Sequence, residues 1–206
     1  MFTTSSGKTS WIFCLVAMVV YSVVYTFVNH LPLNRKILPF ILGEEKIPFL
    51  PWTLIIYLSS FLQAILVMRC TPWEILRKTL PAFGILLIVS FLVFVLFPVR
   101  FPRELYPSHS MLVNYFQSVD KDGNCFPSLH VIIPIMFSGI YSWIAISRMR
   151  ICMIWAWTVL IVVSVFTTKQ HYVVDVFAAV VMVVPVMFYL KRKVLREVKM
   201  IPTLRP

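Results

Sequence analysis

The chain has 206 residues, of which 60% are hydrophobic and 13% are charged. Soluble domains carry about a quarter charged residues, so the composition excludes an ordinary soluble protein and predicts one integral membrane domain over residues 1–206. The net charge of +11 lies in short basic clusters between apolar runs. This pattern favours the cytoplasmic loops of a membrane protein over a surface that binds nucleic acid.

Six apolar runs predict six membrane-spanning helices and therefore an all-α, polytopic bundle. Each run is about long enough to cross a hydrocarbon core of roughly 30 Å. The first run is interpreted as an uncleaved span, because it is long for the apolar part of a signal peptide and lacks an A-x-A-like cleavage site. The predicted spans are residues 11–28, 52–68, 81–97, 128–146, 151–166 and 172–190.

Two connecting segments are long. Residues 30–51 contain four prolines, and their Leu, Ile and Phe content predicts a connector that lies along the membrane interface. Residues 99–127 form the longest polar stretch and close with the turn-forming sequence Asp122-Gly123-Asn124. The link between the second and third spans is predicted to be a short basic loop that includes Arg77 and Lys78.

The cations predict the orientation. With the N-terminus in the cytoplasm, twelve of the 19 Lys and Arg residues fall on cytoplasmic segments, among them Lys8, Lys199 and Arg205. This bias predicts cytoplasmic termini and places the links after spans three and five on the opposite face. That face would be periplasmic in a bacterial inner membrane and lumenal in a eukaryotic membrane. The basic tail from Lys191 is interpreted as an orientation signal, and it could also bind anionic lipid.

His171 and Asp175 form the first candidate site, at the start of the sixth predicted span. On a helix, a spacing of four residues places two side chains on one face. A carboxylate that holds one nitrogen of an imidazole fixes the tautomer and makes the other nitrogen a better nucleophile. The alternative is a buried polar pair with a structural role only.

His130 and Ser128 form the second candidate site, at the start of the fourth predicted span. Ser128 is a plausible N-cap, and the free amides of a first helical turn are a natural phosphate site. A histidine at that position could protonate a leaving oxygen. The alternative is a capping serine beside an interfacial histidine.

Three cations lie on the same predicted face as these residues. Guanidinium groups suit phosphate oxygens, so Arg100 and Arg103 are candidate phosphate ligands, with Lys169 as a further one. The alternative for all three is a long side chain that reaches from the end of a span to the interface.

Two other classes of function compete for the same residues. A metal site is disfavoured because no H-E-x-x-H or similar ligand pair is present, so we expect neither a metal nor another cofactor. A proton-coupled transporter would also use intramembrane His and Asp, but related halves or broken helices in matching positions are not evident.

At these residues the sequence resembles the type 2 phosphatidic acid phosphatase superfamily, whose membrane members have six spans and three motifs on one face. The P-S-x-H motif is matched by Pro127-Ser128-Leu129-His130, and the H-x-x-x-D motif by His171 and Asp175. The resemblance implies that His171 attacks phosphorus, that Asp175 orients it and that His130 protonates the leaving group. It implies that Ser128 and neighbouring amides hold phosphate oxygens, without a metal.

The sequence departs from the family pattern at two cations. The family lysine falls on Leu96 and the arginine before the third motif on Val165, with Arg100, Arg103 and Lys169 as possible substitutes. In these departures the chain is similar to the branch that contains inositol phosphorylceramide and sphingomyelin synthases. The predicted function is therefore a membrane-bound lipid phosphate phosphatase. The alternatives are a phosphotransferase that uses a lipid or polyol hydroxyl and, third, a transporter or inactive scaffold. The oligomeric state stays open.

Overall fold

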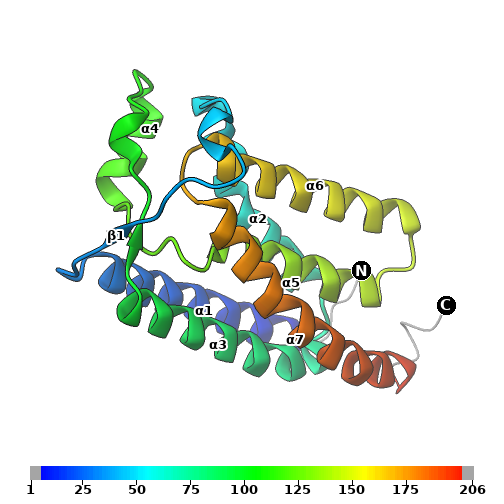
Figure 1. The fold of residues 1–206 in the computed structure, drawn as a ribbon. Coiled ribbons are helices and arrows are strands. Elements are labelled where there is room, and N and C mark those ends of the chain that lie inside the picture. Colours follow the sequence, from blue (N-terminus) through cyan, green and yellow to red (C-terminus); the bar gives the residue numbers. More distant parts are fainter. Residues whose placement is uncertain (1–5, 201–206) are drawn as a thin grey trace.

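The computed structural model describes residues 6–200, with the side chains of residues 15–196. Among the orientation cations, the side chains of Lys8 and Lys199 and the whole of Arg205 lie outside this part. The described chain forms seven α-helices (Figure 1). They are α1 (Ser6–Asn29), α2 (Leu54–Cys70), α3 (Trp73–Leu96), α4 (Met111–Val119), α5 (Leu129–Ile144), α6 (Arg148–Thr167) and α7 (Val173–Met200).

The remaining regular structure is short. Two strands of two residues each, β1 (Lys36–Ile37) and β2 (Val99–Arg100), pair in parallel and join the two long connectors. Three 3-10 turns complete the elements: η1 (Glu44–Lys46), η2 (Pro51–Thr53) and η3 (Arg103–Leu105). The predicted helical fold is confirmed, whereas the strand pair was not predicted from the sequence.

Within residues 15–196, four helical segments are long and apolar enough to cross a membrane, which makes this a membrane protein. They are Pro51–Cys70, Trp73–Leu96, Arg148–Thr167 and Val173–Arg196. Two further apolar helical segments, Leu15–Asn29 and Leu129–Ile144, are shorter. Large apolar side chains are exposed along α1, α3, α6 and α7, as expected for helices whose outer faces contact lipid instead of water.

Two helix ends differ from the prediction. Helix α3 begins at Trp73, so Arg77 and Lys78 lie on a helix and not in a loop, and Pro81 lies inside it. Helix α7 continues ten residues beyond the predicted end of the span at residue 190. Hydropathy marks where a span leaves the apolar layer, whereas Lys, Arg, Glu and Leu all continue a helix well.

Helix α5 is the centre of the bundle. It packs against α2, α6 and α7, and most of its side chains are buried. Met187 of α7 packs directly against Gly139, because a Cβ at this position would lie 1.6 Å from the terminal methyl carbon of Met187 and would force that side chain to move. Since α5 begins with Leu129-His130, this central packing fixes the position of one of the predicted site residues.

The connectors divide between the two ends of the bundle (Figure 1). The short turns between α2 and α3 and between α5 and α6 lie at one end, with the C-terminal part of α7. The long segments 30–53 and 97–128 and the link between α6 and α7 lie at the other end. Both motif segments are therefore at the same end of the bundle.

Candidate active site

His171 lies in the link between α6 and α7 and not on a helix, which differs from the helical spacing assumed for the His171–Asp175 pair. Helix α7 begins at Val173, and Asp175 is in its first turn. The chain folds back at this point because the Oδ2 atom of Asp175 accepts a hydrogen bond from the backbone N–H of Tyr172, at 2.9 Å. The two side chains still meet, with 3.2 Å between His171 Nδ1 and Asp175 Oδ2.

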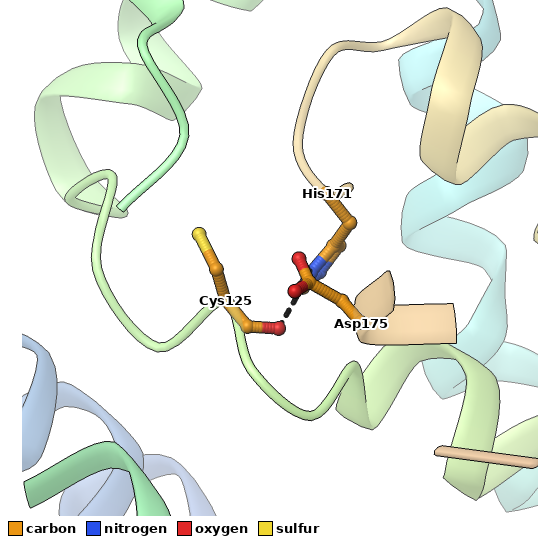
Figure 2. A group of neighbouring side chains, drawn as sticks. All are labelled: Cys125, His171 and Asp175. Carbon is orange, nitrogen blue, oxygen red and sulfur yellow. Dashed lines mark hydrogen bonds and ion pairs between the residues drawn. The ribbon is translucent and has the colours of Figure 1, made fainter. Parts of the chain in front are cut away.

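The hydrogen bonds of His171 fix its tautomer. Its Nδ1 atom lies 2.9 Å from the backbone oxygen of Cys125 and 3.2 Å from Asp175 Oδ2. Figure 2 shows this backbone oxygen, and not the Cys125 sulfur, pointing toward the imidazole. A carbonyl oxygen can only accept a hydrogen bond, so Nδ1 must carry the proton. The Nε2 atom of a neutral His171 is then left with its lone pair.

Cys125, His171 and Asp175 also bring three possible metal ligands within 4.8 Å of one another. The thiol of Cys125, however, donates to the backbone oxygens of Asp122 and Gln170, at 3.1 and 3.6 Å. Burial, reinforced by the charge of Asp175, raises the pKa of this thiol well above its ordinary value. Metal binding needs the thiolate. A metal ion bound here would therefore have to displace the thiol proton and these two hydrogen bonds.

His130 is positioned by helix α2. Its Nδ1 atom lies 3.0 Å from the hydroxyl oxygen of Ser60. Its ring stacks on Tyr57, with 3.8 Å between centroids, and meets the edge of Phe61 at 5.4 Å. The imidazole centroids of His130 and His171 are 6.4 Å apart. The structure therefore brings together the two histidines that the sequence analysis singled out.

Ser128 occupies the predicted N-cap position of α5, with extended backbone angles, but its hydroxyl does not cap the helix. The side chain is fully buried, and among the described residues its oxygen has no hydrogen-bond partner. The backbone N–H of Ser128 donates to the backbone oxygen of Asp175, at 3.2 Å, and so joins the two motifs. A buried hydroxyl without a partner costs about 1–3 kcal/mol, so the Ser128 hydroxyl is free to bind a ligand or a water molecule.

Arg103 is buried beside the same site. Its guanidinium donates to the backbone oxygen of Asp120 at 2.6 Å and to its carboxylate at 3.2 Å. The Nε atom is buried without a partner among the described residues. The ring of Phe116 lies between Arg103 and the aromatic residues around His130. Its centre is 5.9 Å from the guanidinium carbon and 5.8 Å from the centre of the Tyr57 ring, which stacks on His130.

Arg100 has ion-pair partners on its own connector. It pairs with Glu104 and with Asp122, each at 2.9 Å. Its side chain is 29% exposed, and hydrogen bonds to these two carboxylates raise its pKa. The arrangement gives Arg100 a role in fastening the connector, and of the two arginines only Arg103 lies against the aromatic side chains around His130.

Lys169 is buried two residues before His171, in a left-handed backbone conformation with a φ of 55°. Its amino group donates to the backbone oxygens of Glu44 and Glu45, at 3.1 and 3.5 Å, and lies 4.5 Å from the centre of the Tyr106 ring. Burial lowers its pKa. A non-glycine residue in this conformation is unusual, and these bonds help to hold it there.

Glu44 is a site residue that sequence reasoning missed. Its side chain is buried, and its carboxylate accepts hydrogen bonds from the backbone N–H groups of Ile41 and Val173. Val173 is the first residue of α7, so Glu44 caps the helix that carries Asp175. In the sequence, Glu44 is simply part of a polar group inside the connector 30–51, and no local signal links it to α7.

A family model described as PAP2 superfamily matches residues 51–189 of the chain. The matched region runs from the start of η2 into the last turns of α7 and includes both motif segments. No curated protein and no solved structure matches the chain.

Proposed function

The chain belongs to the PAP2 superfamily, and from this membership we propose that it hydrolyses a lipid phosphomonoester or pyrophosphate through a phosphohistidine. Membership supports a phosphatase or phosphotransferase type of activity at the level of the superfamily. The observation that carries the finer proposal is the tautomer of His171, whose Nδ1–H is held by two acceptors.

In the first step, Nε2 of His171 attacks phosphorus. The N–P bond forms as the bond between phosphorus and the leaving oxygen breaks, and the imidazole gains positive charge. Asp175 faces the Nδ1–H and stabilises that charge, as the aspartate does in serine-protease triads. The carbonyl oxygen of Cys125 adds a second fixed acceptor that keeps the ring in place.

His130 is the proposed acid for the leaving oxygen. In phosphoryl transfer the attacking and leaving atoms lie roughly in line on either side of phosphorus. The two imidazole rings, with centroids 6.4 Å apart, are close enough to serve one phosphoryl group from opposite sides. In the second step His130 takes a proton from water, the water oxygen bonds to phosphorus, and the N–P bond breaks to release phosphate.

The phosphate oxygens are proposed to lie at the start of α5. The hydroxyl of Ser128 is buried there without a partner, and the first amides of a helix have no partner within the helix. The buried Nε–H group of Arg103 could donate to the phosphate as well, beside the Ser128 hydroxyl and the helix amides. Donors fixed in a water-poor site stabilise the charge of the transition state strongly.

The proposed topology has six spans, with α1 and α5 crossing in addition to α2, α3, α6 and α7. The cation bias then places the two histidines at the non-cytoplasmic face. Cysteine-accessibility labelling at residues introduced near Lys121 and Arg148 should mark opposite sides of the membrane. Labelling of both positions from one side would contradict six spans.

The decisive experiment is chemical trapping of the phosphoenzyme. Purified protein is mixed with a labelled lipid phosphate and quenched, and the adduct should be acid-labile and base-stable. His171→Ala should abolish both the adduct and turnover. His109→Ala is the matched control, because His109 is an exposed histidine in the segment 97–128. An adduct that persists in His171→Ala would overturn the assignment.

A second candidate function is transfer of the phosphoryl group to an alcohol. The aromatic residues around His130 favour this second function. Tyr57 and Phe61 pack against the imidazole ring, and only 6% of the His130 surface is exposed. Such a cover disfavours water and suits an apolar acceptor. Product analysis with added diacylglycerol or glycerol decides between the two: a phosphorylated alcohol identifies a transferase, and free phosphate alone identifies a phosphatase.

A further inference from the structure

At the end of the bundle opposite the two histidines, α3 and α7 bring their cations together. Arg77 and Lys78 lie in the second turn of α3, and Lys193 and Arg196 lie near the C-terminal end of α7. With Pro81 they line an open hollow of about 460 Å³. The two helices pack against each other along the bundle (Figure 1).

The hollow gathers positive charge from two helices. Among the described residues, Arg77, Lys193 and Arg196 have no ion-pair partner. Glu74 lies in the first turn of α3, and the side chain of Glu197 lies outside the described residues. Like charges brought together on helices are destabilising, so an anion in the hollow would relieve the repulsion.

The surroundings of the hollow indicate what kind of anion it binds. Phe188 and Tyr189 lie one turn closer to the middle of α7 and are 69% and 57% exposed. The amino group of Lys193 lies 4.8 Å from the centre of the Tyr189 ring. Cations next to exposed aromatic residues at the end of a span are typical of the zone where head groups meet acyl chains.

We propose that this hollow binds the phosphate head group of an anionic phospholipid from the leaflet at this end of the bundle. Its acyl chains would lie along the exposed aromatic side chains of α7. A volume of about 460 Å³ falls within the range of roughly 300–1,000 Å³ usual for small-molecule sites. An orientation signal needs only cations on the cytoplasmic side, and they can be scattered. The cations of this hollow instead come from α3 and α7, which are far apart in sequence, and line one place.

The test measures lipid binding to full-length protein purified in detergent and stripped of lipid. The probes are phosphatidylglycerol, phosphatidylcholine with the same acyl chains, and inorganic phosphate. Native mass spectrometry counts bound lipid, and the thermal unfolding midpoint reports its effect. Each cation near an anionic surface contributes roughly a five-fold gain in affinity. The variant Arg77→Gln/Arg196→Gln, which loses two cations from the hollow, should therefore bind phosphatidylglycerol about twenty-five-fold more weakly.

Arg148→Gln/Arg150→Gln is the matched control. These arginines start α6 at the same end of the bundle and are exposed, but they do not line the hollow. The control should keep wild-type affinity. Equal losses in both variants, or equal binding of the two lipids, would overturn the proposal. Full displacement of the lipid by millimolar phosphate would also overturn it, because the site would then be one for a free anion.

If the variant fails to fold, the salt dependence of lipid binding to wild-type protein still tests the proposal. Wild-type protein should lose phosphatidylglycerol at high salt and keep it at low salt, because exposed charge interactions are screened. Salt-independent binding would contradict a head-group site. Since every readout is binding or unfolding, the result does not depend on the catalytic proposal.

Discussion

Replacing Glu44 with glutamine tests how the link that carries His171 is held. The buried carboxylate accepts from two backbone N–H groups, one of them at Val173, the first residue of α7. Glutamine has a single acceptor oxygen, so its amide N–H₂ would face one of these donors. An unsatisfied buried donor costs about 1–3 kcal/mol, and loss of a negative charge at a helix N-terminus costs about 0.3–1 kcal/mol more.

We therefore expect Glu44→Gln to destabilise the protein by about 1–4 kcal/mol and to reduce kcat more than it changes KM. The reason is that Val173 lies two residues from both His171 and Asp175, so a shift there disturbs the nucleophile before it disturbs binding. Turnover of a lipid phosphate and the thermal unfolding midpoint, which moves by roughly 2–4 °C per kcal/mol in a chain of this size, are the measurements.

Glu45→Gln is the control, since Glu45 is exposed and only its backbone oxygen contacts Lys169. The control should behave as wild type. The reasoning would be refuted if Glu44→Gln matched the control in both measurements. A lower unfolding midpoint with unchanged kcat would assign Glu44 to the fold alone and not to the site.

Three further outcomes are expected. Ser128→Ala should stabilise the protein by about 1 kcal/mol, because it removes a buried hydroxyl without a partner, while raising KM; an unchanged KM in a turnover assay would exclude phosphate binding by Ser128. His130→Ala should lose roughly 10²–10⁴-fold in rate on an alkyl phosphate but much less on nitrophenyl phosphate, and equal losses on both would remove its role as an acid. Activity should survive EDTA, and its abolition with rescue by zinc would reassign His171 and Asp175 as ligands.

The sequence predicts those parts of the site that depend on short-range pattern. Hydropathy finds the apolar spans, and the motif spacing finds Ser128, His130 and the His171–Asp175 pair. The contacts that position these residues come from far along the chain. Ser60 is 70 residues from His130, and Glu44 is 129 residues from Val173. No local signal reports such contacts, because packing of the whole bundle creates them.

The prediction of helix ends fails for a related reason. Apolar content reports only where a helix lies inside the membrane. The apolar run ends at residue 190, although α7 continues to Met200. The cations beyond the apolar layer form helix as readily as the apolar residues do. Their placement on α3 and α7, and not in loops, is what allows them to line one hollow.

The connector before α2 contributes contacts to the site that its motifs do not include. The hydroxyl of Tyr172 accepts from the backbone N–H of Leu38 and donates to the backbone oxygen of Arg100, at 3.2 and 3.1 Å. Leu38 and Glu44 both precede residue 51, where the family match begins. A version of this protein trimmed to the matched region would keep every motif residue and lose the groups that brace the link carrying His171. The residues needed to position His171 thus extend beyond the region that the family model matches. Relatives that differ before residue 51 can hold the same motifs with other contacts.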